Sequence, residues 1–278
     1  MSAGYRDRQA AHLSAAERTA AYLVTRMPAT YAAAHSVLRE VRARLGDISV
    51  ASVLDVGAGT GAASLAAREC WGSGARITMI DRDAAFTQAA RQWLPDANVI
   101  ADDLTGIDTF PQHDLVIAAY SLGELQKTLT RQLWAAARVA FVVIEPGTPR
   151  GYSKVLAIRD ELLSAGAHML APCPAATACP LTAPDWCHFA ARVERSSLHR
   201  RIKNAELGYE DEKFSYVVLA RQPVELPPAR IIRRPHHAPG LIELRTCTPA
   251  GLYTQQVRKR DGDTYRSARH AAWGDALS

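Results

Sequence analysis

The sequence predicts an α/β protein in which helices cover both faces of a parallel sheet. Three observations predict it. Short β-branched runs alternate with helical segments, the first run ends in a glycine-rich turn, and the second ends in Asp81 about 20 residues after that turn. The chain has 278 residues, of which 48% are hydrophobic and 22% charged, and this composition is typical of a folded globule.

Residues 1–50 precede the first predicted strand and have a helical pattern. Ser14 followed by Glu17 predicts a capping box, and Pro28 suits the first turn of a second helix that ends at Gly46. The apolar positions of this second helix recur at helical spacing and form one stripe: Val37, Leu38, Val41 and Leu45.

The run ASVLDVGAGTG, residues 51–61, predicts a strand, a glycine turn and the start of a helix. Glycines let a ligand approach the backbone, and a helix N-terminus offers free N–H donors, so the segment is typical of a nucleotide-like binding site. Asp81 ends the next strand, where a carboxylate can accept hydrogen bonds from a ribose. A turn that only connects strand to helix remains an alternative.

Two ligand patterns fit the turn. Gly57, Gly59 and Ala62 satisfy the dinucleotide pattern G-x-G-x-x-A. Asp55, Gly57, Gly59 and Gly61 give D-x-G-x-G-x-G, which resembles motif I of class I S-adenosylmethionine-dependent methyltransferases. We favour the second pattern because pyrophosphate binding does not require an acidic residue at position 55.

Further strands are expected along the chain and complete a Rossmann-like sheet: 98–101, 114–120, 140–145 and 214–222. A ligand should lie at their carboxyl ends, near Tyr120. The resemblance to these methyltransferases implies that Asp102-Asp103, which follow the strand 98–101, hold a position that contacts the adenine. SLGEL follows the fourth strand in place of the Asn/Asp-Pro-Pro-Tyr tetrad of many nucleic-acid methyltransferases. Glu124 is its one carboxylate, and a cap or structural role suits it better than that of a base. We therefore name no catalytic residue.

Three cysteines lie close together at Cys173, Cys179 and Cys187, with the spacing C-x5-C-x7-C. Cys247 is the only later cysteine, and Cys70 lies in a predicted helix, where we expect an ordinary buried thiol. Several converging thiolates suit a soft metal. The Cys-Pro pairs favour an iron–sulfur cluster, the intervals are longer than a usual zinc knuckle, and a site without metal stays open.

Two clusters of basic residues predict contacts to phosphate groups. The chain carries a formal charge of +5, with 33 Lys and Arg against 28 Asp and Glu. At helical spacing Arg192, Arg195 and His199 would share one face. Such clusters give affinity without sequence choice, and a solvated surface is the alternative. The first cluster comprises Arg192, Arg195, Arg200, Arg201 and Lys203, and the second comprises Arg258, Lys259, Arg260, Arg266 and Arg269.

The composition divides the chain into three expected parts. These are an N-terminal helical region (1–50), a methyltransferase-type domain (51–222) with a cysteine-rich insertion at about 166–213, and a small basic β-rich unit (223–278). No apolar run reaches the length of a membrane span, and the N-terminus lacks the apolar core of a signal peptide. We expect a cytoplasmic protein with reduced thiols.

Four stretches of this sequence resemble a known family. They are DVGAGTG, the cysteine series with DWCHF, RVERSSLHRRIKNAELGYEDEKFSYV and VRKRDGDTYRSARHAAWGD. Together they resemble the methyltransferase-like small-ribosomal-subunit assembly family, which is known from mitochondria and also present in bacteria. The resemblance covers most of the chain beyond about residue 20, and the long run from Asp185 to Val217 is its most specific part.

The resemblance implies a class I methyltransferase fold and binding to small-subunit ribosomal RNA during assembly. It also implies a 4Fe–4S cluster with Cys173, Cys179, Cys187 and Cys247 as its ligands. Two alternatives remain: an active S-adenosylmethionine-dependent rRNA methyltransferase, and an iron–sulfur sensor that links iron or redox status to translation. We expect a monomer away from the ribosome.

Overall fold

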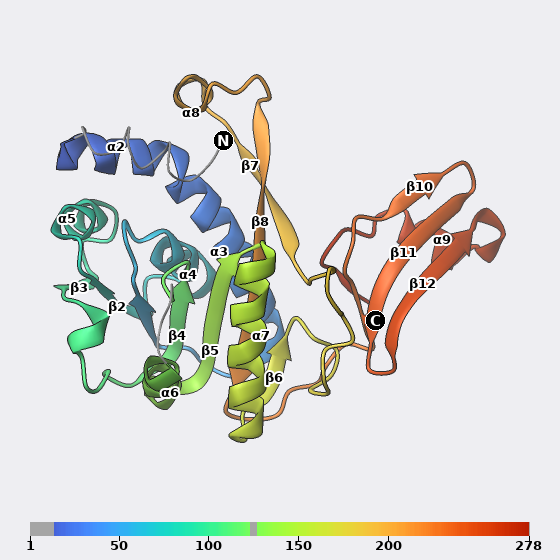
Figure 1. Cartoon of the computed structure of the whole chain (residues 1–278), viewed down its shortest axis with the longest axis horizontal. Coiled ribbons are helices and arrows are strands. Elements are labelled where there is room, and N and C mark those ends of the chain that lie inside the picture. Colours follow the sequence, from blue (N-terminus) through green and yellow to red (C-terminus); the bar gives the residue numbers. More distant parts are fainter. Residues whose placement is uncertain (1–13, 123–126, 278) are drawn as a thin grey trace.

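The computed structural model describes residues 14–122 and 127–277. Its centre is an eight-stranded sheet with the order β3-β2-β1-β4-β5-β8-β6, and β7 pairs with β8 (Figure 1). The strands are β1 (Ser52–Val56), β2 (Arg76–Asp81), β3 (Asn98–Ala101), β4 (His113–Ala119), β5 (Ala137–Pro146), β6 (His168–Ala171), β7 (Phe189–Glu194) and β8 (Tyr209–Ala220).

The sheet is mostly parallel, which confirms the predicted α/β class with a Rossmann-like, methyltransferase-type architecture. Strands β1 to β5 pair in parallel, whereas β8 runs antiparallel to β5 and β6 runs antiparallel to β8. The expectation of a wholly parallel sheet was therefore wrong at this edge. The sequence did not predict β6, which has four residues and lies at the end of the strand order.

Helices cover both faces of the sheet (Figure 1). The apolar sides of α3, α4 and α5 pack on one face, and those of α6 and α7 pack on the other. The predicted capping box of Ser14 and Glu17 is present, and the predicted stripe of the second helix is buried. The helices are α2 (Ala15–Thr25), α3 (Met27–Leu45), α4 (Ala62–Trp71), α5 (Ala84–Trp93), α6 (Lys127–Ala136), α7 (Pro149–Ser164), α8 (Ser197–Lys203) and α9 (Asp263–Ala268), with short 3-10 turns η1 (Leu104–Gly106) and η2 (Lys259–Asp261).

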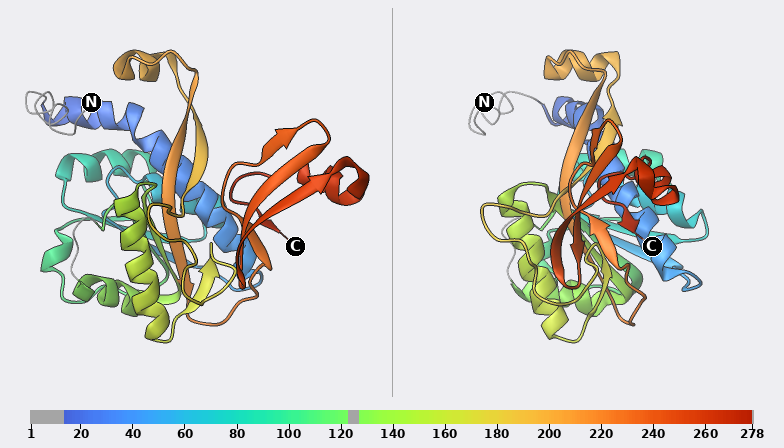
Figure 2. Two further views of the ribbon diagram at one scale, coloured as in Figure 1. Left: turned by 45° about the vertical axis from the view of Figure 1, so that its right-hand side comes forward. Right: turned by 90° about the vertical axis from the view of Figure 1, so that its right-hand side faces the viewer.

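Strand β8 continues beyond the sheet. Its first half pairs only with β7, while its second half pairs with β5 and β6. Together β7, α8 and the first half of β8 form an arm, residues 189–214, that rises from the sheet with α8 beside α2 (Figures 1 and 2). We call it the hairpin arm.

The structure corrects the helical interpretation of the arm. Arg192 lies in β7 and Arg195 lies outside any helix, so they share no helical face with His199 of α8. Six residues of β7 pair with β8, and this ladder outweighs the helix propensity of the run FAARVE. Helix α8 begins only at Ser197, where the Ser196 side chain caps it by accepting a hydrogen bond from His199 N–H.

A second, antiparallel sheet follows toward the C-terminus. Its core is small and consists of Ile231, Ile242, Leu244, Val257 and Ala268. Residues 172–188, which contain three of the cysteines, form no helix or strand and run between the two sheets (Figure 2). The strands of the second sheet are β9 (Ala229–Ile231), β10 (His236–Ala238), β11 (Leu241–Thr248), β12 (Gly251–Arg258) and β13 (Ala276–Leu277).

Candidate metal centre and cofactor loop

Four cysteines line one cavity between the two sheets. Cys173, Cys179 and Cys187 come from the segment 172–188, and Cys247 comes from β11 of the second sheet. The cavity has a volume of about 710 Å³ including its open mouth, and all four cysteines are free thiols. The fold thus gathers residues that lie up to 74 positions apart (247 − 173).

Burial makes three of these thiols hard to ionise. It raises the pKa of Cys173, although the positive charge of Arg159 opposes the shift. The pKa of Cys187 lies well above its ordinary value because of burial and the neighbouring cysteines, and the pKa of Cys247 is raised to about 11 mainly by burial. A thiolate is the form that binds metal, so a metal entering this cavity would release protons.

The charged residues of the cavity lining suit an anionic group. Among the described residues that line it there are two arginines, Arg159 and Arg230, but no Asp or Glu. The Nε of Arg159 is buried and has no hydrogen-bond partner within residues 14–122 and 127–277. An unpaired buried donor is costly unless a guest satisfies it. A 4Fe–4S cluster takes four thiolate ligands, which is the number of cysteines that line the cavity.

A single metal ion requires its ligand atoms to lie closer together than a cluster does. In the described part of the chain, no three His, Cys, Asp or Glu side chains converge closely enough to hold one ion. Zinc, for example, needs each sulfur about 2.3 Å from the metal. The four thiols therefore line a shared cavity without forming a ready single-ion site, and their role as ligands stays a prediction.

Arg230 ties the cavity to three parts of the chain. It is buried, donates to the carbonyls of Pro172 (2.9 Å) and Gly274 (2.7 Å), and forms an ion pair with Glu40 of α3. Tyr216 of β8 also donates to Glu40, at 2.6 Å. Burial alone would raise the pKa of Glu40, but Arg230, Tyr216 and Arg44 together outweigh it and the pKa is lowered. The cavity wall is thus held by a buried charged pair.

The glycine loop lies at the carboxyl ends of β1 and β2. Gly57 has a φ of 64°, and a Cβ at this position would lie 2.3 Å from the Cβ of Ser121, so only glycine fits. Gly59 and Gly61 also have positive φ, at 55° and 85°. Helix α4 begins directly after the loop, as the sequence predicts.

The predicted acidic ligands of the cofactor are engaged within the chain. Asp81 accepts hydrogen bonds from the backbone N–H groups of Gly59 (2.7 Å) and Asp83 (2.8 Å). Asp103 accepts from the backbone and hydroxyl of Thr105, at 2.9 and 2.8 Å. A ribose or adenine would have to compete with or add to these bonds.

Asp55 is buried under the helix that follows the loop. Its carboxylate accepts a 2.7 Å hydrogen bond from Ser64 of α4. Burial raises the pKa of Asp55 to about 6, the bonds from Ser64 oppose this shift, and the charge of Asp81 adds to it. Asp55 therefore braces the loop from below, a position that its place in the motif did not reveal.

Two hydroxyls beside the glycine loop have no partner. Thr60 Oγ1 and Ser121 Oγ are buried and make no hydrogen bond to any described residue. Helix α2 covers the loop through Tyr22, whose hydroxyl would lie 3.9 Å from a Cβ at Gly59 and whose ring packs on Phe86 at 4.8 Å between centroids. The glycine cradle and the two orphaned hydroxyls fit a polar ligand such as S-adenosylmethionine.

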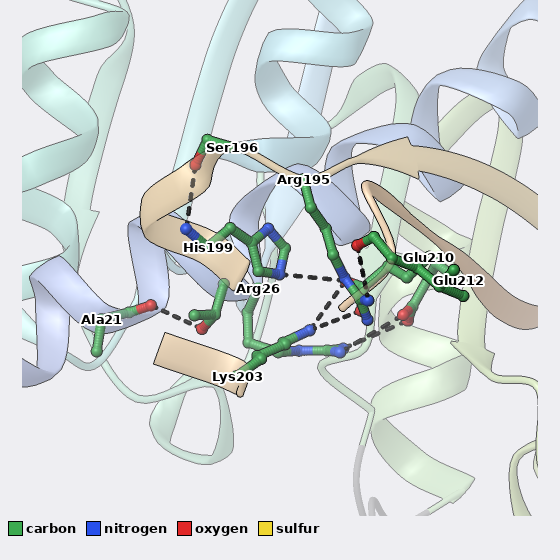
Figure 3. Close-up of polar contacts among 10 residues, drawn as sticks. Ala21, Arg26, Arg195, Ser196, His199, Lys203, Glu210 and Glu212 are labelled. Atoms are coloured by element: carbon green, nitrogen blue, oxygen red, sulfur yellow. Dashed lines mark hydrogen bonds and ion pairs between the residues drawn. The ribbon is translucent and has the colours of Figure 1, made fainter. Parts of the chain in front are cut away.

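The end of β4 connects this loop to the hairpin arm. Tyr120 has a φ of 57°, a rare conformation for a residue other than glycine, and its hydroxyl donates to Glu212 at 3.1 Å. Arg26, between α2 and α3, pairs with the same carboxylate at 3.3 Å (Figure 3). Sequence reasoning missed this triad because its members are far apart in the chain. Glu124 lies outside the described residues.

Most of the first basic cluster is paired within the arm. Glu210 accepts from Arg195 at 2.7 Å and from Lys203 at 2.9 Å (Figure 3). Arg192 pairs with Asp211 at 3.0 Å and lies over the ring of Tyr209. These three cations are therefore partly neutralised before any partner arrives.

The remaining basic side chains are exposed. Arg200 and Arg201 form no ion pair with any described residue. Lys259 and Arg260 lie in η2, just after β12, which ends at Arg258. Trp186 stacks on His188 and donates to the carbonyl of Gly147 at 3.1 Å.

Two curated proteins are similar to most of this chain. It is 29% identical over 289 aligned positions to "Ribosome assembly protein METTL17, mitochondrial" of Homo sapiens, covering 92% of this chain and 61% of that protein. It is 25% identical over 318 positions to "Rsm22-cox11 tandem protein 2, mitochondrial" of Schizosaccharomyces pombe, covering 92% of this chain and 42% of that protein. The chain thus spans less than two thirds of the length of these relatives.

Two solved structures align with part of this chain. A putative RNA methyltransferase, PH1948 from Pyrococcus horikoshii, aligns with a TM-score of 0.43 and 15% identity over 67% of this chain and 81% of that one. The plantazolicin methyltransferase BpumL in complex with SAH aligns with a TM-score of 0.44 and 14% identity over 71% and 86%. The model of the family described as "Mitochondrial small ribosomal subunit Rsm22" matches residues 16–278, and the chain belongs to that family.

Proposed function

We propose that this protein is an assembly factor of the small ribosomal subunit that binds ribosomal RNA and holds a 4Fe–4S cluster in its cysteine cavity. Family membership and the printed name of the human relative support the ribosomal role. The observation that carries the proposal is the cavity itself, where Cys247 of the second sheet meets three cysteines of the segment 172–188.

The proposed role of the cluster is structural. When bound, it supplies iron–thiolate bonds that tie the segment 172–188 to β11. The second sheet needs such support because its own core is small. Arg258 ends β12 and Lys259 and Arg260 follow it directly, so the position of this sheet decides where these cations meet RNA.

The central test is the variant Cys179→Ser. We expect it to lose iron and sulfide and to lose affinity for small-subunit rRNA, because the second sheet is no longer held in place. The matched control is Cys70→Ser, a buried cysteine of α4 that does not line the cavity, and it should retain both properties. Full RNA binding by Cys179→Ser would contradict the structural role.

RNA contact itself can be tested through salt dependence. Arg200 and Arg201 are exposed and unpaired among the described residues, whereas Arg192 is paired with Asp211. Each phosphate contact to a single strand contributes about 0.7 to the slope of log affinity against log salt. The double variant Arg200→Gln/Arg201→Gln should flatten this slope by roughly 1.4, and Arg192→Gln should change it less. An unchanged slope would show that Arg200 and Arg201 of the hairpin arm do not contact RNA.

Methyl transfer is a second candidate function. It is favoured by the glycine cradle and by the orphaned hydroxyls of Thr60 and Ser121. Transfer of a labelled methyl group from S-adenosylmethionine to small-subunit rRNA would support it, and cofactor binding without transfer would favour an assembly factor that keeps only the pocket. No helix among residues 14–122 and 127–277 is long and apolar enough to cross a bilayer. The cytoplasmic location and the monomeric state stay predictions.

A further inference from the structure

Helix α7 carries an arginine at a buried position. Arg159 lies in the apolar stripe of α7, four residues after Val155 and three before Leu162, and is only 4% exposed. Its guanidinium donates to the carbonyls of Ala175 (3.3 Å) and Thr177 in the cysteine segment. A charge at a core position of a helix requires compensation, and here the side chain reaches the cavity where the cysteines meet.

The positive charge at the cavity is only partly offset. Arg230 also lines the cavity, and Glu40 pairs with it as a buried carboxylate. The partner of Arg159 is Asp160, whose side chain is 55% exposed and therefore screened by water. The cavity thus keeps an excess of positive charge near the thiols, with the Arg159 Nε still lacking a partner in the described chain.

A hydrogen bond to one of the cysteines lies on the same helix. Tyr152 is seven residues before Arg159, two turns away on one face of α7, and its hydroxyl donates to the Sγ of Cys179 at 3.2 Å. Net charge and hydrogen bonds to sulfur are among the factors that set the reduction potential of iron–sulfur centres. Both factors come here from α7.

We infer that Arg159 and Tyr152 are positioning residues that stabilise the more negative, one-electron-reduced state of the four-thiolate centre, so that this centre responds to redox conditions. The inference rests on the proposed cluster. Reduction by an external one-electron donor such as dithionite adds one electron to the centre, and hence one negative charge, without making or breaking a bond. The buried guanidinium and the phenol hydroxyl favour that state because they face the added charge in a region of low polarity.

The test is a potentiometric titration of the anaerobically purified protein with dithionite, followed by electron paramagnetic resonance. Arg159→Gln should lower the ratio of reduced to oxidised centre at a fixed potential at least tenfold, which is a shift of 59 mV for one electron. Arg159→Lys keeps the charge and should recover part of the shift. The control is Arg131→Gln, an exposed arginine of α6, which should match the wild type.

Tyr152→Phe tests the inference without touching the loop carbonyls. It removes only the hydroxyl that bonds to Cys179, and we expect a two- to threefold lower ratio with unchanged iron content. This variant keeps the test decisive should Arg159→Gln fail to fold. A wild-type potential in Tyr152→Phe and in a folded, iron-loaded Arg159 variant would overturn the inference alone. A wild-type protein without iron and sulfide would overturn the proposed cluster as well.

Discussion

The cysteine cavity and the glycine loop are two candidate sites in one chain, and they differ in how their polar groups are satisfied. At the glycine loop, Asp81 and Asp55 are hydrogen-bonded by Gly59, Asp83 and Ser64. The cavity is lined by four thiols and by Arg159, and Cys179 accepts a hydrogen bond from Tyr152. The groups left without a partner among the described residues differ in charge: they are the neutral hydroxyls of Thr60 and Ser121 at the loop and one nitrogen of the charged Arg159 side chain at the cavity.

The two sites also differ in how much their occupancy should affect stability. The glycine loop belongs to the large core of the parallel sheet and would keep its shape without a ligand. The cavity joins two sheets, and one of them has a core of only a few side chains. Occupancy of the cavity should therefore matter for stability, while occupancy of the loop should matter for chemistry alone.

The largest expected effect is on metal content. Replacing Cys247 by Ser should reduce iron and sulfide from a full complement to nearly none, because a structural cluster loses one of its four ligands. Hydrogen exchange should then accelerate in β11 and β12 but remain slow in β1 and β4. Equal acceleration of hydrogen exchange in both sheets would contradict the claim that the cavity stabilises mainly the second sheet.

The buried ion pair gives the next largest effect. Glu40→Gln leaves Arg230 without its charge partner, and breaking a buried pair costs about 3 to 5 kcal/mol. Urea denaturation should report this loss, with reduced iron retention because Arg230 lines the cavity. The control Arg131→Gln breaks an exposed pair with Glu161 and should cost less than about 1 kcal/mol. Similar losses in both variants would refute the bracing role of Glu40.

A substitution in the glycine loop should impair cofactor binding without affecting the cysteine cavity. Gly57→Ala combines a positive φ with a clash against Ser121, so we expect a loss of roughly 2 to 4 kcal/mol and of S-adenosylmethionine affinity. Iron content should not change. Gly46→Ala is the matched control, since its φ is 56° but nothing lies within 4 Å of the added Cβ. Calorimetric titration that finds equal cofactor affinity in both variants would contradict the assignment of the loop.

The smallest effect concerns the pH dependence of stability. Burial raises the pKa of Asp55 to about 6, so its protonated form stabilises the fold at low pH and this contribution is lost as the pH rises from about 4 to 6. Asp55→Asn removes the titration, and the wild type should lose about 2 to 3 kcal/mol relative to it over this range. Thermal unfolding at pH 4.5 and 7 measures the difference. If the stability of the two proteins changes equally with pH, burial does not raise the pKa of Asp55.

Local signals in the sequence predicted the glycine loop and the stripe of α3 because both depend on neighbouring residues. The helical interpretation of the run FAARVE was wrong because this run forms a strand by pairing with β8, about twenty residues later in the chain. The cysteine types and spacing indicated a metal, but their meeting with Cys247 depends on how the second sheet folds back. Arg159 left one readable signal, a charge within the apolar stripe of α7. The pairing of Arg26 with Glu212 left none.

The most direct test of the central claim is the iron, sulfide and zinc content of the protein purified without oxygen, together with its visible spectrum. The proposed cluster predicts about four irons and four sulfides per chain. One zinc without sulfide, or no metal at all, would contradict it. Methyl transfer at the glycine loop would then become the better account of the function of this protein.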